Sequence, residues 1–378
     1  YYCHAGRFTQ NSGGFVIMQI QLSEHFTYKK LLRFVMPSII MMIFTSIYSV
    51  VDGLFVSNFV GKTAFAAVNL MMPFLMGVSA LGFMIGTGGS AIVAKTLGEG
   101  KKELANEYFS MLVYVTIIGG LIISIIGMLS VRPVAIMLGA SGKLLQNSIL
   151  YGRILFISLT PFMLQNVFQS FFVAAEKPHL GLRVIVIAGV TNMILDFLFV
   201  AVLHFGLAGA AFATVCGEFI GGLFPVLYFS RNNSSLLKLG KTHFYKRVLL
   251  QTCINGSSEL MTNLSSSIVN SLYNLQLIKF AGENGVAAYG TIMYFGYSIG
   301  SAPIVSYHYG AAHHDELKNL LRKSITLVST WALSLVILAQ LIATPLATLF
   351  VGYDPELFEL TRHGFRLYSI TFLINGFN

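Results

Sequence analysis

Long apolar stretches separated by short polar segments dominate the chain. A helix needs about 20 predominantly apolar residues to cross the hydrocarbon core of a bilayer, and ten stretches approach or reach that length. They lie at residues 33–57, 66–94, 108–130, 149–173, 182–202, 207–229, 248–272, 286–305, 323–350 and 364 onward. This pattern predicts an all-α polytopic membrane protein, in which the eighth segment is too short to span.

Composition supports the same class of protein. Hydrophobic residues make up 55% of the 378 positions and charged residues only 10%, whereas soluble proteins carry about 25% charged residues. The cysteines Cys3, Cys216 and Cys253 share no close spacing, so we expect neither disulfides nor a zinc site. The net charge of +9 comes from basic residues scattered through short loops, which argues against nucleic acid as a partner.

Basic residues also predict the orientation, because cytoplasmic loops accumulate Lys and Arg. Sixteen of them fall on one side of the predicted helices and seven on the other. This places the N-terminus in the cytoplasm of a multi-pass protein of the cell membrane, which we expect to be a monomer. Residues 1–27 form an N-terminal extension without a signal-peptide core, and Met18 is the expected natural start.

An internal repeat divides the chain into two predicted lobes. Gly89-Ser90-Ala91 recurs as Gly300-Ser301-Ala302 at an offset of about 212, while Gly61 matches Gly282 at an offset of about 221. The offset drops between these two matches, which predicts that about ten residues are missing near 294–300. We expect a six-helix lobe at 28–229, a cytoplasmic linker at 230–247 and a second six-helix lobe at 248–378 that lacks its last two helices. Parallel repeats of this kind favour a central cavity.

Four carboxylates lie within the apolar stretches, namely Asp52, Asp196, Glu218 and Glu259. Ionisable groups are costly inside a membrane, so each is a candidate for function. Asp52 and Asp196 lie a few residues from the outer ends of their helices, at a similar depth of about 8 to 10 Å. We therefore expect these two side chains to face one site.

Three uncharged polar residues extend this candidate site. Asn192 precedes Asp196 by four residues, which places both on one helical face, and Asn166 and Thr214 lie on the neighbouring predicted helices. Carboxylate, amide and hydroxyl oxygens together can hold a sodium ion, and a carboxyl group can hold a proton instead. Asn166 and Thr214 also fit a purely structural role as interhelical hydrogen-bonding groups.

The other polar residues point to weaker hypotheses. Glu259 is placed to contact a cationic substrate or a second ion, and a structural hydrogen bond explains it equally well. Glu218 is near the middle of the membrane, where a structural role is slightly favoured. His308, His313 and His314 fit a solvated loop better than a metal site. The sequence has no phosphate-binding motif for a nucleotide cofactor and no reactive constellation within the spans, so we expect no cofactor and no enzymatic activity.

Several segments, taken together and in order, resemble the prokaryotic branch of the multidrug and toxic compound extrusion family. They are PSIIMMIFTSIYSVVDGLFVSNFVG, AAVNLMMPF, AKTLGEGKKELA, NMILDFLFV and GLAGAAFATVCGE. The resemblance implies two six-helix lobes and drug efflux driven by protons or sodium. It also implies a cation site in the first lobe, whose residues match Asp52, Asn166, Asn192, Asp196 and Thr214, and it matches Glu259 more loosely.

The sequence thus predicts a secondary active transporter that exports lipophilic and cationic small molecules, such as drugs or dyes, by antiport with protons or sodium. The alternative is a flippase for lipid-linked oligosaccharides of related fold. Such flippases tend to line their cavity with basic residues, whereas the deep charges of this chain are mainly acidic.

Overall fold

The computed structural model describes residues 40–41, 44–45, 47–293 and 314–370, and this part of the chain is helical without a strand. The expected N-terminal extension with Met18, the expected gap near 294–300, His308 and His313 all lie outside the described residues. After the helical residues 47–55, the elements are η1 (Val56–Val60), α2 (Lys62–Gly98), α3 (Lys102–Met137), α4 (Gly142–Ile157), α5 (Leu159–Ala174), α6 (Pro178–Asp196), η2 (Phe197–Val202), α7 (Gly206–Ser230), α8 (Lys246–Asn255), α9 (Ser257–Met293), α11 (His314–Val351) and α12 (Pro355–Ser369).

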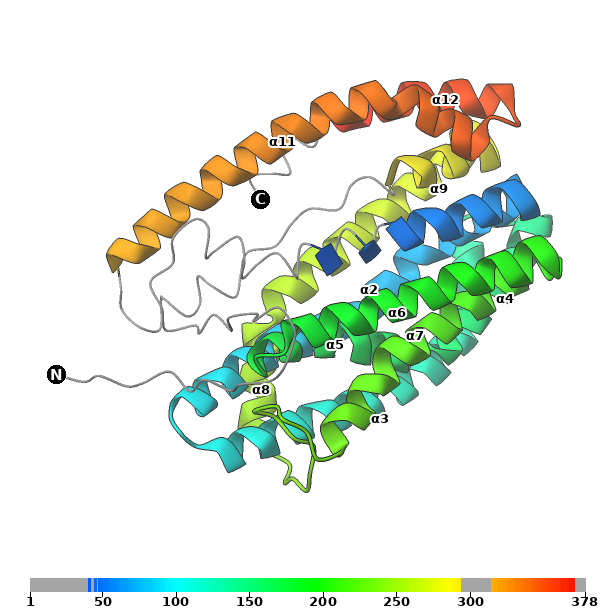
Figure 1. Cartoon of the computed structure of the whole chain (residues 1–378). Helices are drawn as coiled ribbons and strands as arrows, with labels where there is room; N and C mark the ends of the chain where they lie inside the picture. Colours follow the sequence, from blue (N-terminus) through cyan, green and yellow to red (C-terminus); the bar gives the residue numbers. More distant parts are fainter. Residues whose placement is uncertain (1–39, 42–43, 46, 294–313, 371–378) are drawn as a thin grey trace, which may run out of the picture.

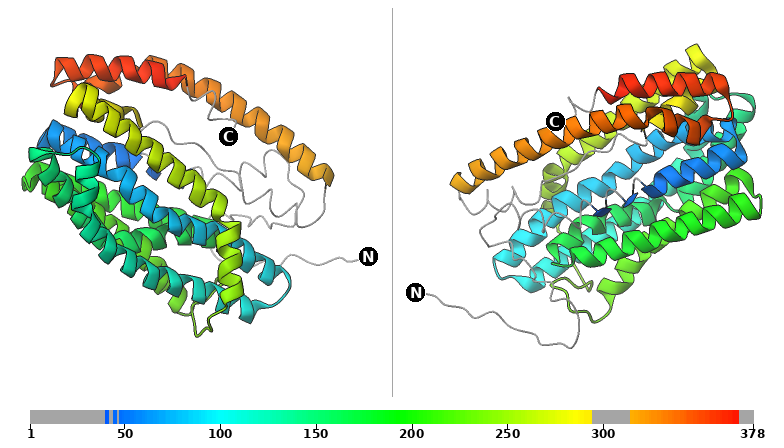
Figure 2. Two further views of the ribbon diagram at one scale, coloured as in Figure 1. Left: turned by 180° about the vertical axis from the view of Figure 1, so that it is seen from behind. Right: turned by 45° about the horizontal axis from the view of Figure 1, so that its top comes forward.

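Helix α2 lies at the centre of the bundle and packs against α3, α4, α5, α8 and α9 (Figures 1 and 2). Small residues let the backbones approach closely, as expected for helices that associate within a membrane. A Cβ added at Gly82 would lie 2.8 Å from the carbonyl oxygen of Met163 in α5, and one at Gly86 would lie 3.1 Å from the carbonyl oxygen of Asn166. The sequence pattern of small and apolar residues in α2 therefore builds the contact with α5.

Four helices are long and apolar enough to cross a membrane on their own, namely α2, α3, α6 continued through η2, and α7. Helices α4 and α5 form a fifth span if they are taken together, although they meet at an angle of 56°. Two shorter apolar helices, Ile47–Val60 and Val336–Val351, lie in the first and ninth predicted stretches. The predicted all-α polytopic fold is thus confirmed, with boundaries that shift by several residues.

Two predicted stretches are broken in the structure. The stretch 149–173 is interrupted at Ser158, where α4 ends and α5 begins, and the Ser158 hydroxyl donates to the carbonyl oxygen of Leu155 over 3.1 Å. The stretch 248–272 is interrupted at Gly256, between α8 and α9. A Cβ at Gly256 would lie 2.1 Å from the carbonyl oxygen of Met84, so close contact with α2 accompanies this break.

The glycines paired by the repeat have similar backbone conformations. Gly61, which precedes α2, has φ 107° and ψ 173°, and Gly282, within α9, has φ 60° and ψ −150°. A positive φ combined with an extended ψ is accessible essentially to glycine alone. The two positions also adjoin each other in space, because the Thr63 hydroxyl donates to the Glu283 carboxylate over 2.7 Å.

The polar linker predicted at 230–247 lies along one end of α3 rather than free in solvent. The backbone N–H of Lys238 donates to the side chain of Asn106, and that of Gly240 donates to the hydroxyl of Ser110, each over 3.0 Å. The hydroxyl of Tyr245 donates to the carboxylate of Glu107. All of these bonds involve residues near the beginning of α3. They therefore attach the linker to α3.

Candidate functional site

The carboxylates of Asp52 and Asp196 contact each other inside the bundle. Asp52 lies in the helical segment before η1 and is 5% exposed, and Asp196 is the last residue of α6 and is fully buried. Their side chains lie close enough to interact electrostatically. The structure therefore brings these two residues together, and their role as one cation site remains a prediction.

A π-helical turn follows each of these aspartates along the chain, on the side predicted to be the outer one. Asp196 leads directly into η2, and Asp52 precedes η1 by four residues. The two turns pack against each other, with the rings of Phe55 and Phe197 at a centroid distance of 6.5 Å. Because π-helical turns occur frequently at functional sites, the local backbone sets this pair apart from an ordinary helix contact.

Several buried polar atoms of the predicted site residues have no hydrogen-bond partner in the described part of the chain. They comprise Oδ1 of Asp52, both carboxylate oxygens of Asp196, both polar atoms of the Asn192 side chain and Nδ2 of Asn166. Buried polar groups in proteins are almost always hydrogen-bonded, so exceptions require an explanation. The oxygens among these atoms, from Asp52, Asp196 and Asn192, are of the kind that can accept a proton or ligate a small cation.

Charge leads to the same conclusion. None of the ion pairs among the described residues involves Asp52 or Asp196. Two adjacent carboxylates repel each other when both are charged. Either one of them holds a proton, or a bound cation balances their charges. An unpaired charge in the centre of a membrane costs about 2.5 to 3.5 kcal/mol even on the lenient scale, so the arrangement favours a bound proton or cation.

Asn192 lies one helical turn before Asp196 and is 3% exposed. A Cβ at Gly217 of α7 would lie 3.2 Å from the Cβ of Asn192, so the side chain of Asn192 starts at the interface between α6 and α7. The predicted shared face of Asn192 and Asp196 follows from their four-residue spacing in α6.

Asn166 and Thr214 are less directly connected to the pair. Asn166 is buried in α5, and the described contacts do not join its side chain to either aspartate. The hydroxyl of Thr214 donates to the carbonyl oxygen of Ala210 in the preceding turn, over 3.2 Å. That bond leaves the oxygen of Thr214 able to accept, and the place of both residues in the cation site remains a prediction.

Glu218 is the functional candidate that sequence reasoning left outside the site. It is half-buried in α7 and interacts electrostatically with Ser158, at the break between α4 and α5, and with Asp52. A signal for this was present, because Glu218 follows Thr214 by four residues and so shares its helical face. The described contacts do not join Glu218 to the aspartate pair by a hydrogen bond.

Glu259 lies elsewhere, in the first turn of α9. Its backbone carbonyl accepts a hydrogen bond from the side chain of Asn263 over 2.8 Å, and its side chain is half-buried. Carboxylates in a first turn stabilise the unpaired N–H groups of a helix. The structure does not bring Glu259 to the Asp52–Asp196 pair. Its position in the first turn of α9 gives it a local structural role, which is to stabilise the start of that helix.

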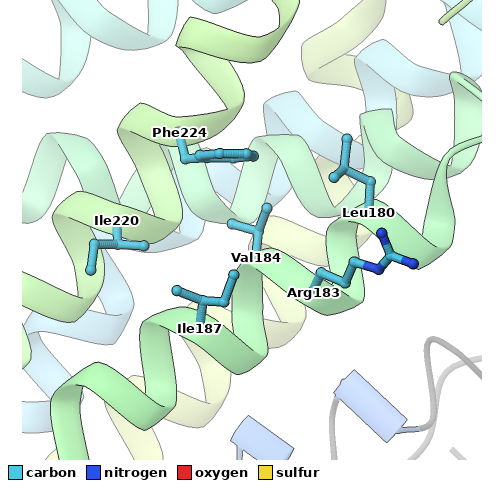
Figure 3. A pocket seen from close by; sticks show the side chains of 6 residues that line it. All are labelled: Leu180, Arg183, Val184, Ile187, Ile220 and Phe224. Atoms are coloured by element: carbon cyan, nitrogen blue, oxygen red, sulfur yellow. The ribbon is translucent and has the colours of Figure 1, made fainter. Parts of the chain in front are cut away.

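An apolar groove of about 160 Å³ between α6 and α7 contains no acidic side chain (Figure 3). It is lined by Leu180, Arg183, Val184, Ile187, Ile220 and Phe224. Ile187 and Phe224 are 54% and 44% exposed, as expected for a surface that faces lipid. Within the described residues no group of His, Cys, Asp and Glu has the arrangement of a metal centre.

A cluster of bonds, which we call the outer contact, joins η1 and the first residue of α2 to the end of α11 and the N-cap of α12. The hydroxyl of Ser57 donates to the carbonyl oxygen of Phe350 over 2.8 Å, and Lys62 pairs with Asp354 at 3.1 Å. The side-chain amide of Asn58 donates to the carbonyl oxygen of Leu349 over 3.3 Å. In the expected orientation, these bonds lie at the outer surface and join the two segments there.

Asp354 has two roles in the outer contact, which substitutions can separate. The N–H of Leu357 donates to its carboxylate, and this bond together with Lys62 lowers the pKa of Asp354 below its ordinary value. We expect Asp354→Ala to lower stability by about 1 kcal/mol through the lost helix cap. Lys62→Ala should have a smaller effect, because Lys62 is 45% exposed and solvent screens such pairs.

Thermal unfolding of the purified variants measures both effects. Because the pKa of Asp354 is lowered, its contribution is fully present above the ordinary carboxyl range and is lost only as the pH falls through the lowered pKa. Asp354→Ser keeps a capping oxygen and should recover most of the loss. An equal loss for Asp354→Ser and Asp354→Ala would show that the cap contributes nothing.

The chain matches known proteins over most of its length. The family profile described as MatE matches residues 37–198 and 258–378. The multidrug export protein MepA of Staphylococcus haemolyticus (strain JCSC1435) is 26% identical over 368 residues, which cover 93% of this chain and 80% of that protein.

Solved structures share the fold. An inward-facing and an outward-facing structure of a multidrug resistance MATE family transporter of the MOP superfamily match with TM-scores of 0.76 and 0.77, at 22% and 23% identity. They cover 91% and 92% of this chain and 82% and 79% of those chains. The resemblance drawn from the sequence motifs is confirmed, and the chain belongs to the MatE family of multi-pass membrane transporters.

Proposed function

We propose that this protein is a secondary active transporter that exports lipophilic and cationic small molecules, driven by the inward flow of protons or sodium. The observation that carries the proposal is the contact between the buried carboxylates of Asp52 and Asp196, which have no basic partner in the described part of the chain. The relative from Staphylococcus haemolyticus is named a multidrug export protein, which supports export of chemically varied compounds.

The proposed cycle couples the charge of this pair to the open side of the transporter. While the outer contact is closed, a compound binds from the inner side. A proton or sodium ion that enters from outside then neutralises the pair and favours the state that releases the compound. Each elementary charge moved inward supplies about 2.3 kcal/mol per 100 mV of membrane potential, so one or two ions support a sizeable gradient of exported compound.

The test is ethidium efflux from cells that carry the complete gene, with the proton and sodium gradients collapsed separately. We expect efflux to fall to background when the driving gradient is collapsed and to persist when only the other gradient is removed. Efflux that survives the loss of both gradients, while ATP is depleted, would rule out secondary active transport.

A flippase for lipid-linked oligosaccharides is the second class considered from the sequence. The intramembrane charges that interact electrostatically, Asp52, Asp196 and Glu218, are acidic, which disfavours an anionic pyrophosphate headgroup. Translocation of a fluorescent lipid-linked sugar by reconstituted protein would support the flippase instead.

A further inference from the structure

The apolar groove between α6 and α7 lies on a face of the bundle that we expect to meet lipid. Its lining extends for about one turn along each helix, with Val184 and Ile187 from α6 and Ile220 and Phe224 from α7. Its volume of about 160 Å³ is close to that of an apolar cavity that binds benzene in another protein. A segment of an acyl chain therefore fits into the groove.

Arg183 gives the groove one charged end. Figure 3 shows Arg183 beside Leu180 at one end of the groove, with Ile187 toward the other. Arg183 is exposed and takes part in none of the ion pairs among the described residues. An arginine lays its apolar stem along a hydrophobic surface and keeps its charged head in a polar environment. The guanidinium is therefore available to an anionic group at that end.

The depth of Arg183 places this end of the groove near the inner surface of the membrane. Arg183 is the sixth residue of α6, which begins at Pro178, so it lies about 8 Å along the helix from that residue. In the expected orientation, α6 begins on the inner side. Side chains in a helix point back toward its N-terminus, so the guanidinium extends toward the level of the lipid headgroups.

The charges at the inner ends of α6 and α7 are mainly basic. Lys177 is the N-cap of α6, His179 lies in its first turn, and Arg231 follows the end of α7. The acidic residue at these two ends, within the described part of the chain, is Glu176, which is exposed and forms none of the described ion pairs. The first N–H groups of a helix also attract anions. This end therefore complements a phosphate group, and the groove complements an acyl chain.

We propose that the groove between α6 and α7 binds an anionic phospholipid of the inner leaflet. The phosphate binds the guanidinium of Arg183, which can donate two parallel hydrogen bonds to it, and one acyl chain lies in the groove against Ile187, Ile220 and Phe224. A zwitterionic lipid carries a cation beside its phosphate, so it binds more weakly. The proposal does not depend on ion-coupled export, because no residue of the candidate cation site lines the groove.

The test measures lipid binding to the purified full-length protein in detergent by native mass spectrometry. The probes are dioleoylphosphatidylglycerol, which is anionic, and dioleoylphosphatidylcholine, which has the same acyl chains but no net charge. We expect the wild type to retain the anionic lipid in preference. Arg183→Gln should weaken binding of this lipid by about fivefold, the typical effect of one basic residue near an anionic membrane surface. Arg183→Lys keeps the charge and should retain most of the preference.

Matched variants separate the charge from the groove. Arg132→Gln makes the same change at an exposed arginine five residues before the end of α3. It lies outside the groove and should bind the anionic lipid as the wild type does. Ile220→Trp fills the groove without changing the charge and should also weaken binding. Glycerol 3-phosphate, which presents the phosphate without acyl chains, should not displace the lipid.

Three results would overturn the proposal. Equal retention of the two lipids by the wild type would indicate unselective contact with the surrounding bilayer. Wild-type binding by Arg183→Gln or by Ile220→Trp would remove the headgroup contact or the groove from the site. Displacement by glycerol 3-phosphate would indicate a site for a free phosphate. If Arg183→Gln is not recovered as folded protein, the lipid preference of the wild type and the binding by Ile220→Trp decide the question.

Discussion

Asp196→Asn is expected to reduce dye efflux to the level of cells without the transporter, while the protein is still made and inserted. The substitution keeps the shape of a fully buried side chain but removes its ability to take up and release a charge. Because the carboxylate contacts Asp52, Asp52→Asn should have the same effect. The double variant should be no worse than either single variant, since the two residues act as one unit.

Ethidium efflux, normalised to the amount of protein in the membrane, measures this effect. Glu103→Gln is the matched control, because it makes the analogous change from carboxylate to amide at an exposed position in the first turn of α3, and it should leave efflux unchanged. Retained efflux by Asp196→Asn would refute the assignment of the ion site. A loss of membrane protein would instead indicate that Asp196 is needed for folding.

Gly88→Ala should produce the largest loss of stability. A Cβ at Gly88 would lie 2.1 Å from the carbonyl oxygen of Thr252 and 2.8 Å from the backbone nitrogen of Gly256. Backbone atoms cannot turn away as a flexible side chain can, so α8 and the start of α9 would have to move off α2. We expect the free energy of unfolding to fall by about 1 to 3 kcal/mol, as for other overpacked interiors.

Thermal unfolding of purified protein measures the effect. The readout is the loss of the monodisperse peak in size-exclusion chromatography after heating. Gly119→Ala is the matched control on α3, since a Cβ there would meet nothing within 4 Å. Alanine also favours a helix over glycine, so Gly119→Ala should be neutral or slightly stabilising. Equal stability of the two variants would contradict the close approach at Gly88.

The sequence predicted the spans and the aspartate pair for clear physical reasons. Hydropathy identifies α2, α3 and α7 because a helix that crosses a membrane needs a long, predominantly apolar stretch. Equal depth in the membrane anticipated the contact of Asp52 with Asp196, and four-residue spacing placed Asn192 beside it. These arguments depend only on the helical period and on the bilayer.

The remaining features depend on how helices pack, which hydropathy does not contain. The break at Ser158 lies in a uniformly apolar stretch, so no change of composition marks it. The rotation of α7, and with it the direction of Glu218, depends on the close contacts of its glycines with Pro161 and Gln165. Hydropathy gives the depth of a residue in the membrane but not the rotation of its helix.

The break at Ser158 places two helix ends inside the bundle. Helix α4 ends at Ile157 and α5 begins at Leu159, so the partial negative charge at the end of one helix lies beside the partial positive charge at the start of the other. The two backbone charges oppose each other, and the break supplies no net charge to the acidic residues of the bundle. Their charge is balanced by whatever proton or cation the site has bound.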